Sequence, residues 1–404
     1  MQSTVSHPAP IRVRDSETRQ GAVKSHDLPR RVSFDERLRL FLSQWVFSTL
    51  HGVTWGDWWR LLRRIRFQVD PRYFPRAMFI TFCSVFNSSQ ARREEKHFAS
   101  AVRRVRIHPP VFILGHYRTG TTYLHYLLTL DKQFAFPNMY QGEFPHCFLT
   151  TEPLYSRLAQ FLTIRKRPMD EMAISMSAPM EDEVALCVMT FLSPYMGLVL
   201  PRGNGEYDPY LTFRGVAPEE VERWKAAFTY FLKKLTYKYN RPLVLKSPPH
   251  TSRLRLLLEM FPDARFIHIH RNPYTVFQST KHLLQRIGPL FHLQRPDAGD
   301  IDGEIIRRYT EMYDAFFEER GLIRTGRFHE IGFEALEEDT LGQMENVYRA
   351  LNLGGYSDVE PALREYVALG RDYRKNTYRE LPAELRQRIA TAWRRSFNEW
   401  DYAI

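Results

Sequence analysis

Residues 111–128 read VFILGHYRTGTTYLHYLL, in which a short apolar run is followed by a glycine-containing loop and then by a helical pattern. The run Val111–Leu114 follows two prolines and ends at a glycine, as is typical of a buried strand. After the loop, Leu124, Leu127 and Leu128 recur at the spacing of one helix face. The sequence therefore predicts a strand, a tight loop and a helix in direct succession.

The same alternation returns further along the chain. We expect strands over 242–245 and 265–269, each followed by a helix, over 252–260 and 274–284. Strands that alternate with helices imply a mainly parallel sheet that is covered on both faces. The predicted fold class is therefore α/β, with a P-loop-like and mainly parallel sheet flanked by helices.

The remaining sequence divides into regions around this sheet. Residues 1–31 are predicted to be a disordered tail and residues 32–105 a helical N-terminal extension. The α/β domain is predicted over 106–404, with a helical insertion at about 153–240 whose apolar residues are able to cap the sheet and wall a substrate cavity. The sequence contains no internal repeat, low-complexity tract or heptad array.

Composition narrows the classes of function. The 404 residues are 44% hydrophobic, which is enough apolar material for a large core and excludes a wholly disordered chain. Lys and Arg (57) exceed Asp and Glu (46), and the net charge of +11 favours an anionic partner such as a phosphorylated small molecule, a nucleic acid or a membrane surface. The three cysteines share no CxxC spacing, so we expect neither a disulfide framework nor a cysteine zinc site. The compartment expected for such a chain is reducing and cytoplasmic.

Two apolar segments precede the sheet, and neither is expected to span a bilayer. Leu40–Gly56 is interrupted by polar residues, and Ala77–Phe86 is only ten residues long. Tryptophans and arginines follow the first segment, so residues 38–66 are able to lie flat on an anionic membrane as a peripheral contact. The alternative is an amphipathic helix packed on the main domain, which is the commoner arrangement. The first thirty residues also lack the apolar block of a secretory signal.

The glycine loop has the spacing of a phosphate-binding loop, with one departure. Gly115–Thr122 carries Thr121 where such loops carry lysine. Backbone N–H groups and threonine hydroxyls at the helix start still converge on an anion. The missing cation is expected from Arg118 and from Lys246, which ends the next strand where a nucleotide hydrolase would bring an aspartate. This pattern argues against metal-dependent ATP chemistry and favours transfer of a less charged group such as sulfuryl.

In this loop and in three later segments the chain resembles the sulfotransferase superfamily, in particular its bacterial-type domains and, more distantly, the protein tyrosine sulfotransferases. The matching segments are RTGTTYL at 118–124, LKSPPH at 245–250, HRNP at 270–273 with Ser279 behind it, and FEALEED at 333–339. Their co-occurrence in this order is much more specific than any one of them. The resemblance covers about residues 111–353.

The resemblance implies 3′-phosphoadenosine 5′-phosphosulfate (PAPS) as the co-substrate and no metal ion. In the family the first loop cradles the 5′-phosphosulfate, and a strand-end arginine and a serine in the next helix contact the 3′-phosphate. The donor-binding residues implied in this way are Arg118, Thr119, Gly120, Thr121, Thr122, Arg271 and Ser279. The planar fork of an arginine suits phosphate oxygens, which agrees with this role for Arg271.

Transfer to a hydroxyl or amine acceptor also needs a base for the acceptor's proton. Glu143 follows the first helix, where related sulfotransferases place a catalytic glutamate, and His146 is the alternative because the ordinary pKa of histidine lies nearer neutrality. The predicted catalytic residues are therefore Glu143, Lys246, Arg118 and His146. A second acidic cluster, Glu181–Glu183, opens a helix, where we expect either helix capping or a place in the pocket.

Four other positions are candidates for contact with the donor. His116, inside the loop, and His250, after the paired prolines, either contact the donor or face away from it. Arg374 and Asn376 are candidates to close over a donor phosphate because of their place late in the chain.

Two other functions compete with sulfuryl transfer. A small-molecule or nucleotide kinase with a degenerate loop would need a magnesium-binding carboxylate beside that loop. A non-catalytic basic module would bind a membrane through its positive surface, and the chain carries no nucleic-acid motif. The aromatic residues between 134 and 231 fit an apolar pocket for a small-molecule or lipid-like acceptor and fit ordinary core packing equally well. The sequence predicts no oligomeric state.

Overall fold

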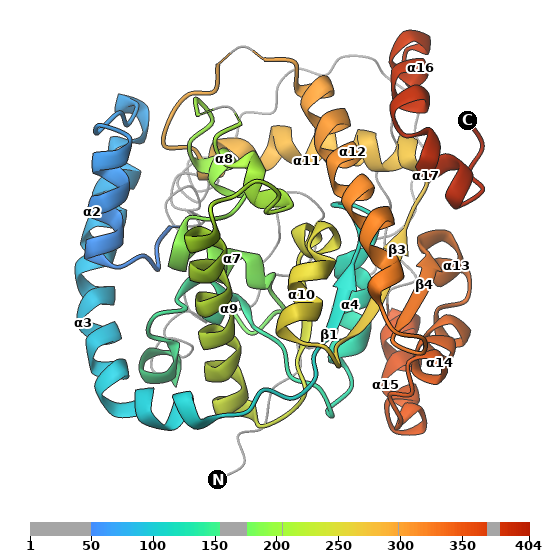
Figure 1. The fold of residues 1–404 in the computed structure, drawn as a ribbon, viewed down its shortest axis with the longest axis horizontal. Helices are drawn as coiled ribbons and strands as arrows, with labels where there is room; N and C mark the ends of the chain where they lie inside the picture. Colours follow the sequence, from blue (N-terminus) through green and yellow to red (C-terminus); the bar gives the residue numbers. More distant parts are fainter. Residues whose placement is uncertain (1–49, 154–175, 204, 298, 370–379) are drawn as a thin grey trace, which may run out of the picture.

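The computed structural model describes residues 50–153, 176–203, 205–297, 299–369 and 380–404. Within this part, a parallel sheet with the strand order β2-β1-β3-β4 forms the centre (Figure 1). The strands are β1 (Val111–Leu114), β2 (Val244–Lys246), β3 (Arg265–His270) and β4 (Phe328–Gly332). The predicted α/β fold with its mainly parallel sheet is confirmed.

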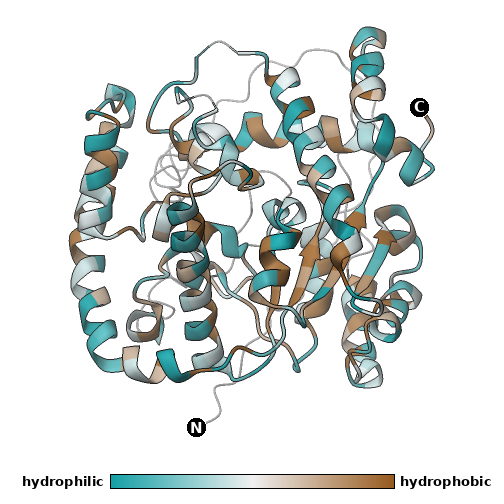
Figure 2. Ribbon diagram, viewed as in Figure 1, coloured by the Kyte–Doolittle hydropathy of each residue, from teal (hydrophilic) through white to brown (hydrophobic). Residues whose placement is uncertain are grey.

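The sheet is covered on both faces, as the apolar strands predict. Along β1, Phe112 and Leu114 belong to one hydrophobic cluster, whereas Val111 and Ile113 belong to another. This alternation follows from the two-residue period of a strand, which sends successive side chains to opposite faces. Figure 2 shows the strands as a hydrophobic centre with hydrophilic surfaces outside it.

Helices fill the space between and around the strands. In the α/β region they are α4 (Thr121–Thr129), α5 (Met139–Glu143), η3 (Pro248–Ser252), α10 (Leu254–Met260), α11 (Pro273–Phe291), α12 (Ile301–Glu319), η4 (Arg320–Leu322), α13 (Phe333–Glu338), α14 (Thr340–Ala350), α15 (Tyr356–Leu369), α16 (Ala383–Ala392) and α17 (Arg394–Glu399). Four of them, α4, α13, α14 and α15, contribute to the cluster that contains Val111 and Ile113.

The described part of the N-terminal extension is helical and lies at one edge of the molecule (Figure 1). It consists of α2 (Trp55–Arg64), η1 (Pro71–Tyr73) and α3 (Phe74–Arg104). The predicted tail, the first part of the predicted membrane contact, and Arg374 and Asn376 lie outside the described residues. None of the described helices is both long enough and apolar enough to cross a membrane.

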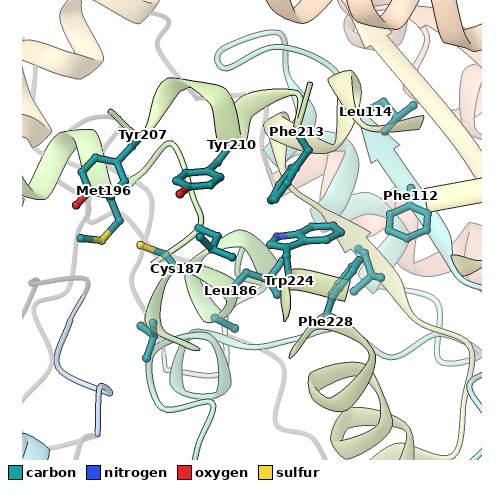
Figure 3. Close-up of a cluster of buried hydrophobic side chains, with 14 of the residues drawn as sticks. Phe112, Leu114, Leu186, Cys187, Met196, Tyr207, Tyr210, Phe213, Trp224 and Phe228 are labelled. Carbon is teal, nitrogen blue, oxygen red and sulfur yellow. The ribbon is translucent and has the colours of Figure 1, made fainter. Parts of the chain in front are cut away.

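The described part of the predicted insertion is also helical and covers one face of the sheet. It contains α7 (Asp182–Thr190), α8 (Met196–Val199), η2 (Asp208–Leu211) and α9 (Pro218–Tyr239). Figure 3 shows Trp224 and Phe228 of α9 beside Phe112 of β1, and the ring centroids of Phe112 and Phe228 are 6.4 Å apart. The helix is thus held on the sheet by aromatic packing.

Two predicted helices have different ends in the structure. The helix expected over 252–260 is α10, which begins at Leu254 because the paired prolines form the 3₁₀ turn η3 before it. The helix expected to end at Leu284 is α11, which continues to Phe291 and contains Pro289. Proline removes a helical hydrogen bond but does not end a helix that is packed on its neighbours.

Buried charges hold the start of α7 against the end of β2. Arg253 donates to Glu183 through Nη1 at 2.6 Å and Nη2 at 3.0 Å, and both side chains are fully buried. Beside this pair, Asp182 accepts a hydrogen bond from Ser247 Oγ at 3.0 Å and pairs with His250 Nε2 at 2.5 Å. Burial alone would raise the pKa of Asp182, but these partners hold it below its ordinary value. We call these five residues the α7 clamp.

The α7 clamp makes a stability prediction. Glu183→Gln keeps the side-chain shape but leaves the buried Arg253 guanidinium without its counter-charge, so we expect the free energy of unfolding to fall by about 3–5 kcal/mol. Urea denaturation measures this loss. Glu360→Gln is the matched control, since Glu360 pairs with the exposed Arg364 and should change stability by at most about 1 kcal/mol. Equal losses for the two variants would show that the clamp does not stabilise the fold.

Candidate active site

The loop between β1 and α4 has a backbone that only glycine permits at two positions. Gly115 has φ 143°, and a Cβ there would lie 2.5 Å from the carbonyl oxygen of Ile269. Gly120, the N-cap of α4, has φ 100°, and its Cβ would lie 2.2 Å from the ring of Phe333. The glycines that suggested an anion-binding loop are therefore required by the close approach of β3 and of α13.

Inside the loop, several polar groups are already used by the protein. Thr119 Oγ1 donates to the carbonyl of His116 at 2.8 Å, and the amide of His116 donates to the hydroxyl of Tyr313 at 3.3 Å. Burial lowers the pKa of His116 to about 4, so this histidine is neutral near pH 7. Thr119 and His116 therefore shape the loop. The amides of Thr121 and Thr122 are in the first turn of α4, where N–H groups have no partner within the helix.

The structure brings together three of the predicted donor-binding residues. Arg118 Nε donates to Ser279 Oγ at 2.9 Å, and Arg271 Nη1 donates to the carbonyl of Arg118 at 3.4 Å. The guanidinium of Arg271 also lies 4.3 Å from the ring centroid of Phe333, the ring that abuts Gly120. The loop, the end of β3 and the helix α11 thus supply one cationic cluster.

Lys246 is the last residue of β2, and its largely buried side chain reaches the start of α4. Its Nζ lies 2.5 Å from Glu181 Oε1 and 3.5 Å from Thr122 Oγ1. The other carboxylate oxygen of Glu181 accepts a hydrogen bond from the hydroxyl of Tyr195. The ring of Tyr195 packs beside that of Tyr117, with a centroid distance of 6.2 Å. An ammonium, a carboxylate and two phenol rings therefore meet beside the loop.

Glu181 is the residue whose place the sequence predicted least well. It is the N-cap of α7, and its side chain is 24% exposed, so it faces a space that solvent reaches. The next two residues, Asp182 and Glu183, are the buried carboxylates of the α7 clamp. Three consecutive acidic residues therefore have different surroundings. An acidic cluster at a helix start was the only signal for Glu181, and that signal is common.

The two predicted bases, Glu143 and His146, have other neighbours. Glu143 ends α5, and burial raises its pKa to about 8. Its backbone carbonyl lies against Gly52, while the preceding Gly142 lies against Met180. Among the residues that the structure describes, no contact joins Glu143 to Lys246 or to the loop.

His146 faces a different cavity. The cavity has a volume of about 230 Å³ and is lined by Ala91, Arg92, Glu94, Glu95, Pro145, His146, Met189 and Tyr230. Burial lowers the pKa of His146 to about 4, and its Nε2 has no hydrogen-bond partner among the described residues. The cavity lies between α3 and α9, whereas Lys246 and the loop lie at the end of the sheet. The structure thus groups Arg118, Lys246, Arg271 and Ser279 near one edge and places His146 apart from them.

Comparison with known proteins identifies the family of the chain. The model of the sulfotransferase family matches residues 109–358. Two relatives, omega-hydroxy-beta-dihydromenaquinone-9 sulfotransferase Stf3 from Mycobacterium bovis and from Mycobacterium tuberculosis, are each 36% identical over 360 residues, or 89% of this chain and 92% of the relative.

Two solved structures share the fold. Sulfotransferase STF9 from Mycobacterium avium has a TM-score of 0.66 at 19% identity and covers 94% of this chain and 99% of its own. Sulfotransferase STF1 from Mycobacterium tuberculosis has a TM-score of 0.58 at 16% identity and covers 89% of this chain and 99% of its own. With the family model matched over most of the chain and relatives of 36% identity along nearly its whole length, the chain belongs to the sulfotransferase family.

Proposed function

We propose that this sulfotransferase moves a sulfuryl group from PAPS to a hydroxyl group of a lipid-like acceptor without a metal ion. The observation that carries the proposal is the place of Lys246, whose ammonium lies between Glu181 and Thr122 at the start of α4. A cation, a carboxylate and a helix N-terminus meet there. These are the parts that stabilise a leaving oxyanion and accept a proton from an attacking hydroxyl.

The residues around the loop fit the two charged ends of the donor. Arg118 and Ser279 are within 2.9 Å of each other, so they are able to bind the same anion or adjacent ones. The free N–H groups and the positive dipole end of α4 favour a further anionic group. We assign the 5′-phosphosulfate to Arg118, Gly120, Thr121 and Thr122, and the 3′-phosphate to Arg271 and Ser279, with Thr119 keeping the loop in shape.

The chemistry then divides between three side chains. The donor supplies an activated sulfuryl group on a phosphate leaving group. Lys246 neutralises the negative charge that develops at the leaving oxygen. When its ammonium turns toward that charge, Glu181 Oε1 becomes available to accept the proton of the acceptor hydroxyl. Tyr195 orients the carboxylate through Oε2, and because burial and the charge of Glu181 raise the pKa of Tyr195 well above its ordinary value, this phenol remains a donor.

Lys246 also favours a metal-independent reaction over the competing kinase. In P-loop phosphotransferases the last threonine or serine of the loop binds magnesium through its hydroxyl. In this chain the hydroxyl of Thr122 holds that position, and the nearby charge is the ammonium of Lys246 at 3.5 Å. A lysine side chain therefore supplies the positive charge that a metal ion supplies in those enzymes.

A lipid-like acceptor is supported by the relatives and by the aromatic rings near Glu181. The two relatives of 36% identity are named for a hydroxylated dihydromenaquinone, which combines a long apolar body with a hydroxyl group. The rings of Tyr117 and Tyr195 lie beside the Glu181 carboxylate and offer apolar surface to such a body.

The donor assignment is tested with adenosine 3′,5′-bisphosphate, the desulfonated product. A ligand that binds only the native state adds about 2.7 kcal/mol of stability at 100 times its Kd, so the nucleotide should raise the Tm in a thermal unfolding scan. Arg271→Ala should weaken nucleotide binding by roughly 10–100-fold, whereas Arg364→Ala, an exposed control on α15, should leave it unchanged. Absence of any shift at saturating nucleotide would refute the assignment.

The identity of the base is tested by comparing two variants in which a glutamate is replaced by glutamine. Glu181→Gln should lower kcat by about 10²–10⁴ while the Kd of the bisphosphate stays near that of the wild type. Glu143→Gln should leave kcat nearly unchanged. It should also stabilise the fold increasingly from pH 5 to about 8, since the raised pKa of Glu143 makes the wild type lose stability as pH rises from the ordinary carboxyl range to about 8.

The opposite outcome identifies Glu143, the residue predicted from sequence, as the base. In that case Glu143→Gln abolishes turnover, Glu181→Gln does not, and kcat/KM of the wild type increases with pH up to about 8.

Metal independence is tested by chelation. Turnover with purified donor should be the same with and without excess EDTA, because Lys246 provides the charge. Lys246→Met should lower kcat in both conditions, by about 10²-fold or more. Loss of wild-type turnover in EDTA, recovered on addition of magnesium, would support the kinase-like alternative.

A further inference from the structure

One face of α3 exposes a row of large apolar side chains. Phe74, Met78, Phe82 and Val85 are 52%, 68%, 76% and 55% exposed. Their spacing of four, four and three residues places them on the same side of the helix. Exposed apolar patches of this kind mark interaction surfaces more often than isolated apolar residues do.

The row continues onto α2, which packs against α3. Trp58 Nε1 donates to Thr81 Oγ1 at 2.8 Å, and the amide of Trp55 donates to Ser88 Oγ at 2.7 Å. These contacts place the first turn of α2 beside Thr81 and Ser88 of α3, so the two helices run antiparallel and the end of α2 leads back toward the start of α3. In that turn Phe67 is 52% exposed, so the two helices share one apolar surface, which lies at the edge of the molecule (Figure 1).

Exposed arginines accompany this apolar surface. Residues 55–78 contain six arginines, of which Arg76 is buried, and two aspartates, a net charge of +4. Arg63, Arg66 and Arg72 are exposed, and Arg63 lies over the ring of Trp59 at 5.6 Å. Aromatic side chains flanked by arginines are the composition of surfaces that bind anionic lipid. We call Trp55–Val85 with these arginines the α2–α3 face.

The α2–α3 face is linked to the active site by a short series of contacts. Arg76, near the start of α3, donates through Nη1 to the carbonyl of His292 at 2.5 Å. His292 Nδ1 lies 2.6 Å from the carbonyl of Leu198 in α8. The residue at the N-cap of α8 is Tyr195, which holds Glu181. One turn of α8 therefore separates Leu198, which His292 contacts, from Tyr195, which holds Glu181.

We propose that the α2–α3 face docks on an anionic lipid bilayer, so that a membrane-embedded acceptor reaches Glu181 without leaving the lipid. Charge complementarity supports this occupant. A second copy of the chain is disfavoured, since a two-fold interface through this face would oppose the same arginines to one another. The choice of acceptor rests on the proposed function, whereas the docking surface itself rests only on exposure and charge.

The test is sedimentation of the full-length chain with vesicles. Vesicles that contain phosphatidylglycerol should bind the protein at low salt, and vesicles of phosphatidylcholine alone should bind it much less. The double variant Met78→Ser, Phe82→Ser should bind at least about tenfold more weakly. The double variant Arg63→Glu, Arg66→Glu should bind the phosphatidylglycerol vesicles about fivefold or more weakly for each charge changed. Its vesicle binding should also no longer depend on salt.

The matched control changes apolar residues of similar exposure elsewhere. Leu322 and Leu369 are 44% and 54% exposed, and Leu322→Ser, Leu369→Ser should bind vesicles as the wild type does. All variants change exposed side chains, so circular dichroism and Tm should match those of the wild type. Equal vesicle binding by wild type and Met78→Ser, Phe82→Ser overturns the proposal. So does a wild-type dimer in light scattering that this variant abolishes.

Turnover separates this proposal from the proposed function. With a short, water-soluble hydroxyl acceptor the Met78→Ser, Phe82→Ser variant should keep the wild-type rate, whereas with an acceptor embedded in anionic vesicles it should lose at least about tenfold. Equal rates on the embedded acceptor would overturn the docking role. A chain that binds vesicles but transfers no sulfuryl group from PAPS would keep the docking surface and refute the proposed function.

Discussion

Parallel strands end at the same edge of a sheet, and this constraint gathers the charged residues of the molecule. β1 ends at Leu114 before the glycine loop, β2 ends at Lys246, and β3 ends at His270, next to Arg271. With β1 between the other two strands and neighbours about 4.8 Å apart, segments that are far apart in sequence come within side-chain reach of one another. The hydrogen bonds of Arg118 with Ser279 and of Arg271 with the loop carbonyl are consequences of this order. Ligands of open parallel sheets bind at this edge for the same reason.

The second requirement is a carboxylate beside a largely buried lysine. An ammonium removed from water needs a partner, and Glu181 provides it only because α7 begins at the end of β2. The α7 clamp fixes that position with one fully buried charge pair, Arg253 with Glu183, and with the buried contact between His250 and Asp182. Buried pairs of this kind restrict geometry more than they add stability. In our account the partner that neutralises Lys246 at rest becomes the base once the lysine is engaged elsewhere.

Much of this site could be predicted from the sequence, because a strand, a glycine loop and a helix start are local patterns. Arg118 and Lys246 were predicted from their positions after short apolar runs, and Arg271 was implied by the resemblance to the sulfotransferase superfamily. Glu181 could not be assigned in this way, since its contact with Lys246 joins residues 65 apart through a helix insertion of unknown direction. For Glu143 and His146, position after the first helix gave no information on their surroundings, in which the Glu143 carbonyl lies against Gly52 and His146 lines a cavity beside α9. The α2–α3 face could not be predicted, because the sequence does not show which apolar residues of α3 are exposed and which are packed.

The central claim is that Arg118 and Lys246 act on one transferring group. A double-mutant cycle of Arg118→Met and Lys246→Met, with the rate of sulfuryl transfer measured in single turnover, tests it most directly. We predict that the double variant is only slightly slower than the slower single variant, a coupling of about 1–3 kcal/mol, because groups that act as a unit are not additive. If the activation free-energy losses of the two single variants add up to the loss of the double variant within about 0.5 kcal/mol, as for independent sites, the claim is contradicted.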